Sequence, residues 1–281
     1  MTRQRKRNKL TTLNALDLVL SGYDTVIGSD FIIQKKDPYN ADIGHLDPLS
    51  LRTFDQNFID SLVSLKPIAK VLIPNNLKDL LEKYKANRNL LLGFNEHASD
   101  IVIDHDIKAA KELQNFDPYI KKVVIRNHSE FCLFYEYILL YRKVNYKRAI
   151  FQYSEYFPDN NVYNALLHSN LALLRIDEVL AHGAIKTINV IDRHEYLIFD
   201  ETLNRTSKAG MFLVGTLLNI DSLYLINCGI IFLDPNSFGG KSILTLFKKH
   251  LDNLRIAKTC NNKTMDCARE VFGIALRSGC L

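Results

Sequence analysis

The hydrophobic and polar positions between residues 159 and 205 predict a compact unit that the rest of the chain surrounds. Apolar residues recur at helical spacing over 162–167 and again over 171–180. His182-Gly183 follows, and a glycine just past a helix adopts positive φ without a steric clash. Two β-rich runs come next. The pattern predicts two helices packed on a short sheet, a unit on the scale of a small recognition module rather than an enzyme core.

The segment before this unit has mainly helical spacing. Helices are predicted over residues 54–65, 77–92, 107–114 and 131–141. Gly93 is expected to end the second of them. Proline-containing turns punctuate residues 24–76, which we therefore interpret as an insertion of loops with short helices. Residues 144–156 interleave basic and aromatic side chains, a pattern found both on half-buried helices and on surfaces that bind RNA by charge and stacking.

The segment after the unit contains a strand-like run at 223–233, a turn, and an amphipathic helix over 242–254. The fold class predicted from these patterns is α+β. Three parts are expected: a basic arm with a mostly helical domain (1–158), the α/β module (159–205), and a closing hairpin, helix and basic extension (206–281).

The charge distribution adds information that the fold pattern lacks. The net charge is +5. The first ten residues hold five cations and no acid: Arg3, Arg5, Lys6, Arg7 and Lys9. Such an arm suits a phosphate backbone or an anionic surface. The 159–205 module is acidic by comparison, with Asp177 and Glu178 beside its Arg175.

The cysteines and the hydropathy narrow the class of protein. The chain has five cysteines without the paired spacing of a zinc or redox motif, which favours free thiols in a reducing compartment. No apolar run approaches the ~18 residues of a membrane span, so no membrane partner is expected. At 47% hydrophobic residues, the chain is rich enough in apolar side chains for one or two domains with substantial cores.

One stretch has the residues of a nucleotide-binding motif. Gly240-Lys241-Ser242 stands between a strand and a helix, as the end of a phosphate-binding loop does. The first glycine of that loop would stand at Pro235, which has no N–H to donate. A nucleotide hydrolase is therefore kept only as an alternative function. No catalytic constellation, metal-ligand cluster or cofactor motif is predicted.

Several short segments together resemble the small-subunit ribosomal proteins of the S-four family. His182-Gly183-Ala184-Ile185 is similar to the corner of that family's RNA-binding domain, and Tyr196 matches the start of its last strand. Asp159-Asn160-Asn161-Val162-Tyr163 resembles its opening. Lys9-Leu10-Thr11 with Asp17-Leu18, the basic helix around Glu82-Lys83, and residues 223–235 resemble three further family segments in family order.

The resemblance implies a structural ribosomal protein without catalysis or cofactor. Its expected partners are small-subunit ribosomal RNA and neighbouring ribosomal proteins, with no small-molecule substrate. Its extra segments favour a mitochondrial ribosome, with a bacterial cytoplasm or a plastid as alternatives. An RNA-modifying enzyme carrying a similar module is an alternative function. The expected RNA-binding residues are Arg3, Arg5, Lys6, Arg7, Lys9, Lys83, Lys85, Arg88, Lys147, Arg148, Arg175, His182 and Lys186.

Overall fold

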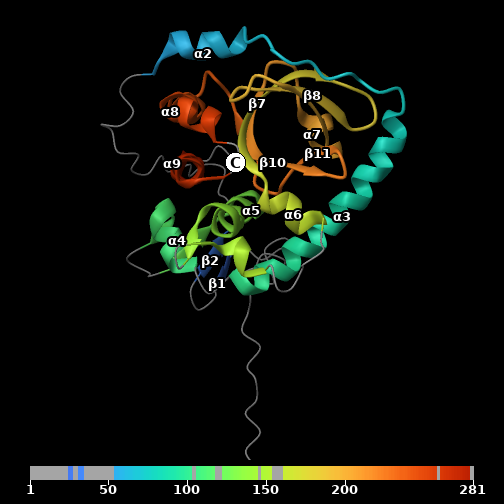
Figure 1. Cartoon of the computed structure of the whole chain (residues 1–281). Helices are drawn as coiled ribbons and strands as arrows, with labels where there is room; N and C mark the ends of the chain where they lie inside the picture. The colour runs from blue at the N-terminus through green and yellow to red at the C-terminus, as the bar shows by residue number, and fades with distance from the viewer. Residues whose placement is uncertain are drawn as a thin grey trace, which may run out of the picture.

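A computed structural model describes residues 25–27, 31–34, 54–102, 106–117, 122–144, 147–153, 161–257 and 260–278. The chain has an α+β fold in which helices surround a small β-barrel (Figure 1). Helices α8 and α9 lie on one side of the barrel and the long helix α3 lies on the other (Figure 1). The expected fold class is therefore confirmed.

Five strands close the barrel. They are β7 (Asn170–Val179), β8 (Ala184–Asn189), β9 (Glu195–Phe199), β10 (Phe212–Ile220) and β11 (Leu223–Ile226). Their order around the barrel is β7-β8-β9-β11-β10, and β10 pairs back onto β7. The β9–β11 pair is parallel and the other four pairs are antiparallel. Helix α7 (Glu201–Thr206) connects the third strand to the fourth. This is the Greek-key topology of the OB-fold, a barrel that closes a sheet without long free edges.

Alternating side chains of the five strands fill the barrel. Its interior cluster consists of Ala172, Leu174, Ile176, Ile185, Ile198, Leu213 and Ile226, with Leu203 from α7. Gly215 lies where β10 faces this core. A Cβ there would stand 2.6 Å from Cγ2 of Ile226, so the position requires glycine.

The outside of the barrel is buried under the remaining elements, which form the larger core. The helices among these elements are α2 (Gln56–Val63), α3 (Leu77–Val102), α4 (Asp106–Leu113), α5 (His128–Glu136), α6 (Asn161–Leu167), α8 (Phe238–Ile256) and α9 (Asn262–Ser278). Helix α5 continues into a π-helical turn, Tyr137–Tyr141, and a 3-10 turn covers Ala149–Tyr153. Strand β12 (Ile231–Leu233) extends the barrel sheet along β10.

Short strands complete the fold. A four-stranded sheet contains β1 (Thr25–Ile27), β2 (Phe31–Gln34), β4 (Lys122–Ile125) and β3 (Phe116–Asp117), in that order. A separate hairpin joins β5 (Lys143–Val144) to β6 (Lys147–Arg148).

An extended segment, residues 64–76, passes over one end of the barrel between α2 and α3, and we call it the strap (Figure 1). The Glu195 N–H donates to the Ala69 carbonyl at 2.9 Å, and the Ile68 N–H donates to the Arg193 carbonyl at 2.9 Å. The Val71 N–H donates to the Glu195 carboxylate at 3.0 Å. Barrels of this topology bind oligonucleotides on this face and on two adjoining loops. In this chain the strap pairs with the β8–β9 turn and with the first residue of β9, at one edge of that face.

Helix α3 packs against the two adjoining loops. A Cβ at Gly183, in the β7–β8 turn, would lie 3.2 Å from Cδ1 of Leu81. Lys83 donates to the Asp221 carbonyl, in the β10–β11 turn, at 2.6 Å. The barrel therefore serves as a scaffold for its surrounding helices.

The predicted helix over residues 171–180 is wrong, because this segment is strand β7. The strand is buried on both faces along much of its length, inside by the barrel core and outside by helices. A continuous apolar run of this kind does not distinguish a buried helix from a buried strand. His182 and Gly183, with φ of 57° and 72°, form the turn into β8 and end no helix.

Three further predictions about the module and the segment after it are corrected by the strand pairing. The expected pair of helices packed on a short sheet is replaced by α6, three barrel strands and α7. The expected boundary between 205 and 206 falls within the barrel, because β10 pairs directly with β7. The expected closing hairpin at 223–233 is also wrong, since β11 and β12 each pair with β10.

The helix predictions elsewhere have mixed outcomes. The helices expected at 54–65, 107–114, 131–141 and 242–254 are found with shifted ends. Helix α3 does not end at Gly93 but continues to Val102. Within the insertion expected at 24–76, β1 and β2 are strands. None of the helices in the described residues is long and apolar enough to cross a membrane.

Candidate functional site

A partly open cavity of about 540 Å³ lies between α3, α5, α7 and the β11–β12 segment, and we call it the thiol hollow. Its apolar wall includes Leu92, Phe131, Leu203, Ile230 and Phe232. Polar side chains, among them Arg88, Asp200, Thr202 and Glu96, line the remainder. The thiols of Cys132 and Cys228 and the imidazole of His128 also lie on its wall. A mostly apolar cavity with a few reactive groups has the character of a small-molecule site.

Helix α5 supplies the main reactive groups on one face. His128, Cys132 and Glu136 are spaced four residues apart, so their side chains follow each other along the helix. The start of the helix is well fixed. The Asn127 side chain accepts from the Glu130 N–H at 2.8 Å, and the Glu130 carboxylate reaches back to accept from the Arg126 N–H at 2.8 Å.

Cys132 is in contact with both an imidazole and a second thiol. Its sulfur lies 3.3 Å from Nε2 of His128. The thiol of Cys228 also reaches the Cys132 backbone carbonyl, with the sulfur 3.7 Å from that oxygen. The hydrogen bond from the Cys228 thiol lowers the pKa of Cys132 to about 5, against the effect of burial and with help from His128 and Arg88. The same contact, together with burial, raises the pKa of Cys228 well above its usual value. The contact therefore favours a thiolate on Cys132 over one on Cys228.

Glu136 is a fully buried carboxyl at the inner end of this face. Its Oε2 accepts from the Gly229 N–H at 2.8 Å and lies 3.9 Å from the Cys228 sulfur. Its Oε1 accepts from the Thr216 hydroxyl. Burial raises the pKa of Glu136 to about 7, while the hydrogen bonds from Thr216 and Gly229 act in the opposite direction. Such a carboxyl changes its protonation near neutral pH.

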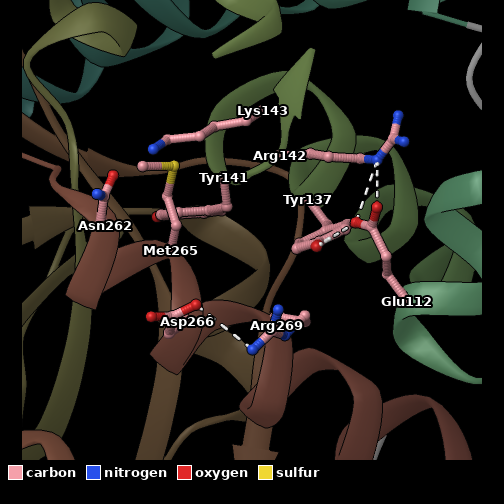
Figure 2. A pocket seen from close by; sticks show the side chains of 9 residues that line it. All are labelled: Glu112, Tyr137, Tyr141, Arg142, Lys143, Asn262, Met265, Asp266 and Arg269. Atoms are coloured by element: carbon pink, nitrogen blue, oxygen red, sulfur yellow. Dashed lines mark hydrogen bonds and ion pairs between the residues drawn. The ribbon is translucent and has the colours of Figure 1, made fainter. Parts of the chain in front are cut away.

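A line of hydrogen bonds connects Glu136 to a second cavity. The Tyr141 hydroxyl lies 2.6 Å from the Thr216 hydroxyl, and Tyr141 lines a cavity of about 340 Å³ next to α9. We call this second cavity the polar hollow. Figure 2 shows that its Glu112 lies between Tyr137 and Arg142. Tyr137 donates to Glu112 at 2.7 Å, and Nε of Arg142 lies 3.1 Å from the same carboxylate. Arg142 and Lys143 extend in opposite directions (Figure 2), so the polar hollow does not gather its cations around one point.

The residues predicted to bind RNA are dispersed, and most of those described make internal contacts. Arg88 donates to the Ile226 carbonyl at 3.0 Å. Arg175 donates to the carbonyls of Leu62 and Val63, and so holds the end of α2 from which the strap begins. The Lys186 ammonium lies 2.8 Å from the Asp177 carboxylate and 3.5 Å from that of Glu178. These cations contribute to folding rather than to an open cationic surface.

The other predicted RNA contacts have separate positions. Arg148 is buried, donates to the Leu167 carbonyl at 2.8 Å and stacks over Phe151. Lys85 pairs with Glu82 on the exposed side of α3 at 2.9 Å. Lys83 donates to the Asp221 carbonyl in the β10–β11 turn, and His182 lies in the β7–β8 turn. The arm residues Arg3, Arg5, Lys6, Arg7 and Lys9, and the side chain of Lys147, lie outside the described residues.

The nucleotide-loop alternative does not match the local geometry. Gly240 and Lys241 lie in the first turn of α8, where Ser237 is the capping residue. The Gly240 N–H donates to the Ser237 hydroxyl at 3.0 Å, and the Lys241 N–H donates to the Ser237 carbonyl at 3.0 Å. The amides that a phosphate loop would present are thus already used. In the described part of the chain, no group of three or more His, Cys, Asp or Glu side chains is arranged to hold a metal ion.

Fold and site together define an α+β protein, built around a five-stranded barrel, with two thiols on the wall of a partly open cavity. The chain belongs to a family of unknown function (DUF7986), whose model matches residues 78–272. This match contains the barrel and all residues of the thiol hollow. No curated protein and no solved structure matched the chain.

The sequence interpretation did not find the thiol hollow. The spacing of His128, Cys132 and Glu136 at intervals of four on a predicted helix was the available signal. The second thiol, Cys228, lies more than 90 positions away along the chain, and no local pattern indicates that it meets Cys132.

Proposed function

We propose that the chain binds a small, mostly apolar molecule in the thiol hollow and that Cys132 is the nucleophile that acts on it. The observation that carries this proposal is the position of the Cys132 sulfur, 3.3 Å from the His128 imidazole on the wall of the cavity. A thiolate is the reactive form of cysteine, and a neighbouring imidazole and thiol favour that form. The proposal departs from the expectation that the chain has no small-molecule substrate.

The surroundings of Cys132 set it apart from the other described thiols. Burial raises the pKa of Cys260, and it raises the pKa of Cys267 to about 12. Neither lines the thiol hollow. Among the described cysteines, the surroundings of Cys132 lower the thiol pKa, so Cys132 is the one expected to react as a thiolate at mildly acidic pH.

Thiol labelling at about pH 6 tests this proposal, because an ordinary thiol is almost fully protonated there. The protein is treated with N-phenylmaleimide, an apolar reagent, and in parallel with the charged reagent iodoacetate, and labelled cysteines are located by mass spectrometry. Cys132 is expected to react first and to prefer the apolar reagent. Cys132→Ser removes this label, and the matched control Cys260→Ser keeps it. Equal labelling of all cysteines, or an unlabelled Cys132, contradicts the proposal.

RNA binding is the second candidate function, and the barrel topology supports it, because barrels of this topology often bind oligonucleotides. We propose that the basic arm and the exposed side of α3 with Lys85 then make the contact, since the strap occupies the β8–β9 turn and α3 packs against the two adjoining loops. In this form the chain would be a structural protein of the ribosomal small subunit. Co-sedimentation with that subunit, with affinity that falls steeply as salt rises, is the expected result. Sedimentation as a free protein at low salt contradicts this candidate.

A further inference from the structure

We infer that Cys132 and Cys228 form a reversible disulfide by exchange with a low-molecular-weight disulfide, and that Glu136 accepts the proton of the Cys228 thiol. This inference rests on the proposed function in one respect, the nucleophilic role of Cys132. It adds a second thiol, a proton acceptor and a class of reaction partner. Glutathione disulfide is a representative of that class.

The backbone brings the two thiols together through a close approach at Gly229. A Cβ at this position would lie 3.2 Å from Cα of Leu133 and 3.0 Å from Oε2 of Glu136. The absence of a side chain therefore allows the segment after β11 to lie directly against α5. The Cys228 sulfur consequently lies 3.7 Å from the backbone carbonyl oxygen of Cys132, the helix residue that precedes Leu133. The two thiols are also hydrogen-bonded to each other, which places their sulfurs side by side.

The exchange has two balanced steps. The Cys132 thiolate attacks one sulfur of the small disulfide, forms a mixed disulfide and releases one thiolate of the reagent. The Cys228 thiol then gives its proton to the Glu136 carboxylate and attacks the Cys132 sulfur. This step forms the internal disulfide and releases the second thiolate. Two protein thiols are oxidised and one reagent disulfide is reduced to two thiols.

Glu136 is the described carboxyl placed to take the Cys228 proton. Its Oε2 lies 3.9 Å from the Cys228 sulfur, on the side of α5 that faces the barrel. The charged or titratable groups that face the two thiols are His128 and Glu136 from α5 and Arg88 from α3. Arg88 and His128 favour the thiolate of Cys132, whereas the negative charges on Cys132 and Glu136 disfavour a thiolate on Cys228. Cys228 therefore needs a base at the moment it attacks.

A disulfide between these residues would join α5 to the β11–β12 segment across the wall of the thiol hollow. Both sulfurs line this cavity in the reduced protein. The oxidised form would remove the nucleophile from the cavity wall, so the two states would differ in their reaction with ligands. The exchange thus gives the proposed ligand site a redox control.

The test uses the full chain, incubated with mixtures of reduced and oxidised glutathione, quenched by acid and alkylated before mass mapping. The wild-type protein is expected to collect a Cys132–Cys228 disulfide with little glutathione attached. Cys228→Ser should instead accumulate glutathione on Cys132, and Cys132→Ser should leave Cys228 unmodified. Cys260→Ser is the matched control and should behave as the wild-type protein does.

The role of Glu136 is tested by the rate of the second step. In Glu136→Gln the mixed disulfide should form at the wild-type rate, and its closure should slow by about tenfold or more, the usual scale of one proton-transfer group. If this variant does not fold, the pH profile of the wild-type protein provides the same test. Closure should slow below about pH 7, while formation of the mixed disulfide continues to lower pH.

The possible failures separate the two proposals. A wild-type protein that keeps glutathione on Cys132 without closing refutes the internal disulfide and leaves the nucleophilic role of Cys132 standing. A closure rate that does not change with pH, or with Glu136→Gln, refutes the role of Glu136. A Cys132 that reacts with neither glutathione disulfide nor the maleimide refutes the proposed function itself.

Discussion

The buried carboxyl of Glu136 makes the stability of the fold depend on pH in a direction that is easily measured. The ordinary pKa of a glutamate is 4.5, and in the folded chain the pKa of Glu136 is raised to about 7 by burial. The folded state therefore holds this proton more tightly than the unfolded state does. The stabilisation is fully present below pH 4.5 and is lost as the pH rises through 7.

The magnitude follows from the two pKa values. Each pKa unit is worth about 1.4 kcal/mol, so the rise from 4.5 to about 7 corresponds to about 3 kcal/mol. The group is completely buried, so screening by solvent does not reduce this figure substantially. A loss on the order of 3 kcal/mol is a large part of the ~5–15 kcal/mol that stabilises a typical domain.

The assay is urea unfolding of the wild-type protein and Glu136→Gln at several pH values between about 4.5 and 8, a range set by the two pKa values. The neutral amide does not titrate, so the difference between the two proteins isolates Glu136 while other groups cancel. Relative to the wild-type protein, the variant should gain about 3 kcal/mol between the lowest and the highest pH. Glu82→Gln, at an exposed position on α3, is the control and should show no such trend. A constant difference across the pH range refutes the reasoning.

Three further perturbations follow from the same contacts. Gly229→Ala places a methyl group against Glu136 and the α5 backbone, and should cost about 1–3 kcal/mol in urea unfolding. Gly93→Ala, where a Cβ meets nothing within 4 Å in the middle of α3, should instead stabilise by about 0.5–1 kcal/mol, and the opposite order of the two glycine variants contradicts the packing. Arg175→Ala removes the donor to the Leu62 and Val63 carbonyls, so limited proteolysis should cut the strap faster. A strap as resistant as in the wild-type protein means that Arg175 does not hold it.

The local elements were largely readable from the sequence, and the barrel was not. Amphipathic spacing placed α4 and α8, whose apolar faces each meet one core. Residues 171–180 have apolar side chains on both faces, because β7 contacts the barrel interior and the outer helices at once. Periodicity carries little information in such a segment. The closure of the barrel also depends on the pairing of β10 with β7, a contact between distant positions that no local pattern specifies.

For the candidate site, too, the sequence showed the individual side chains but not the contacts that they make. The charges of Arg88, Arg148 and Arg175 were plain in the sequence, and they suggested contacts with phosphate. In the fold these guanidinium groups donate to backbone carbonyls at the ends of strands and helices. A sequence gives the charge of a side chain but not its partner. The reactive thiol depends in the same way on a residue from another element, Cys228.

The most direct test of the account is the identity of the first cysteine labelled by N-phenylmaleimide at about pH 6, where an ordinary thiol is almost fully protonated. We expect the label to lie on Cys132, Cys132→Ser to abolish it, and Cys260→Ser to leave its rate unchanged. A first label on any other cysteine, with Cys132 unreactive in the folded protein, would contradict the assignment of the thiol hollow as the functional site.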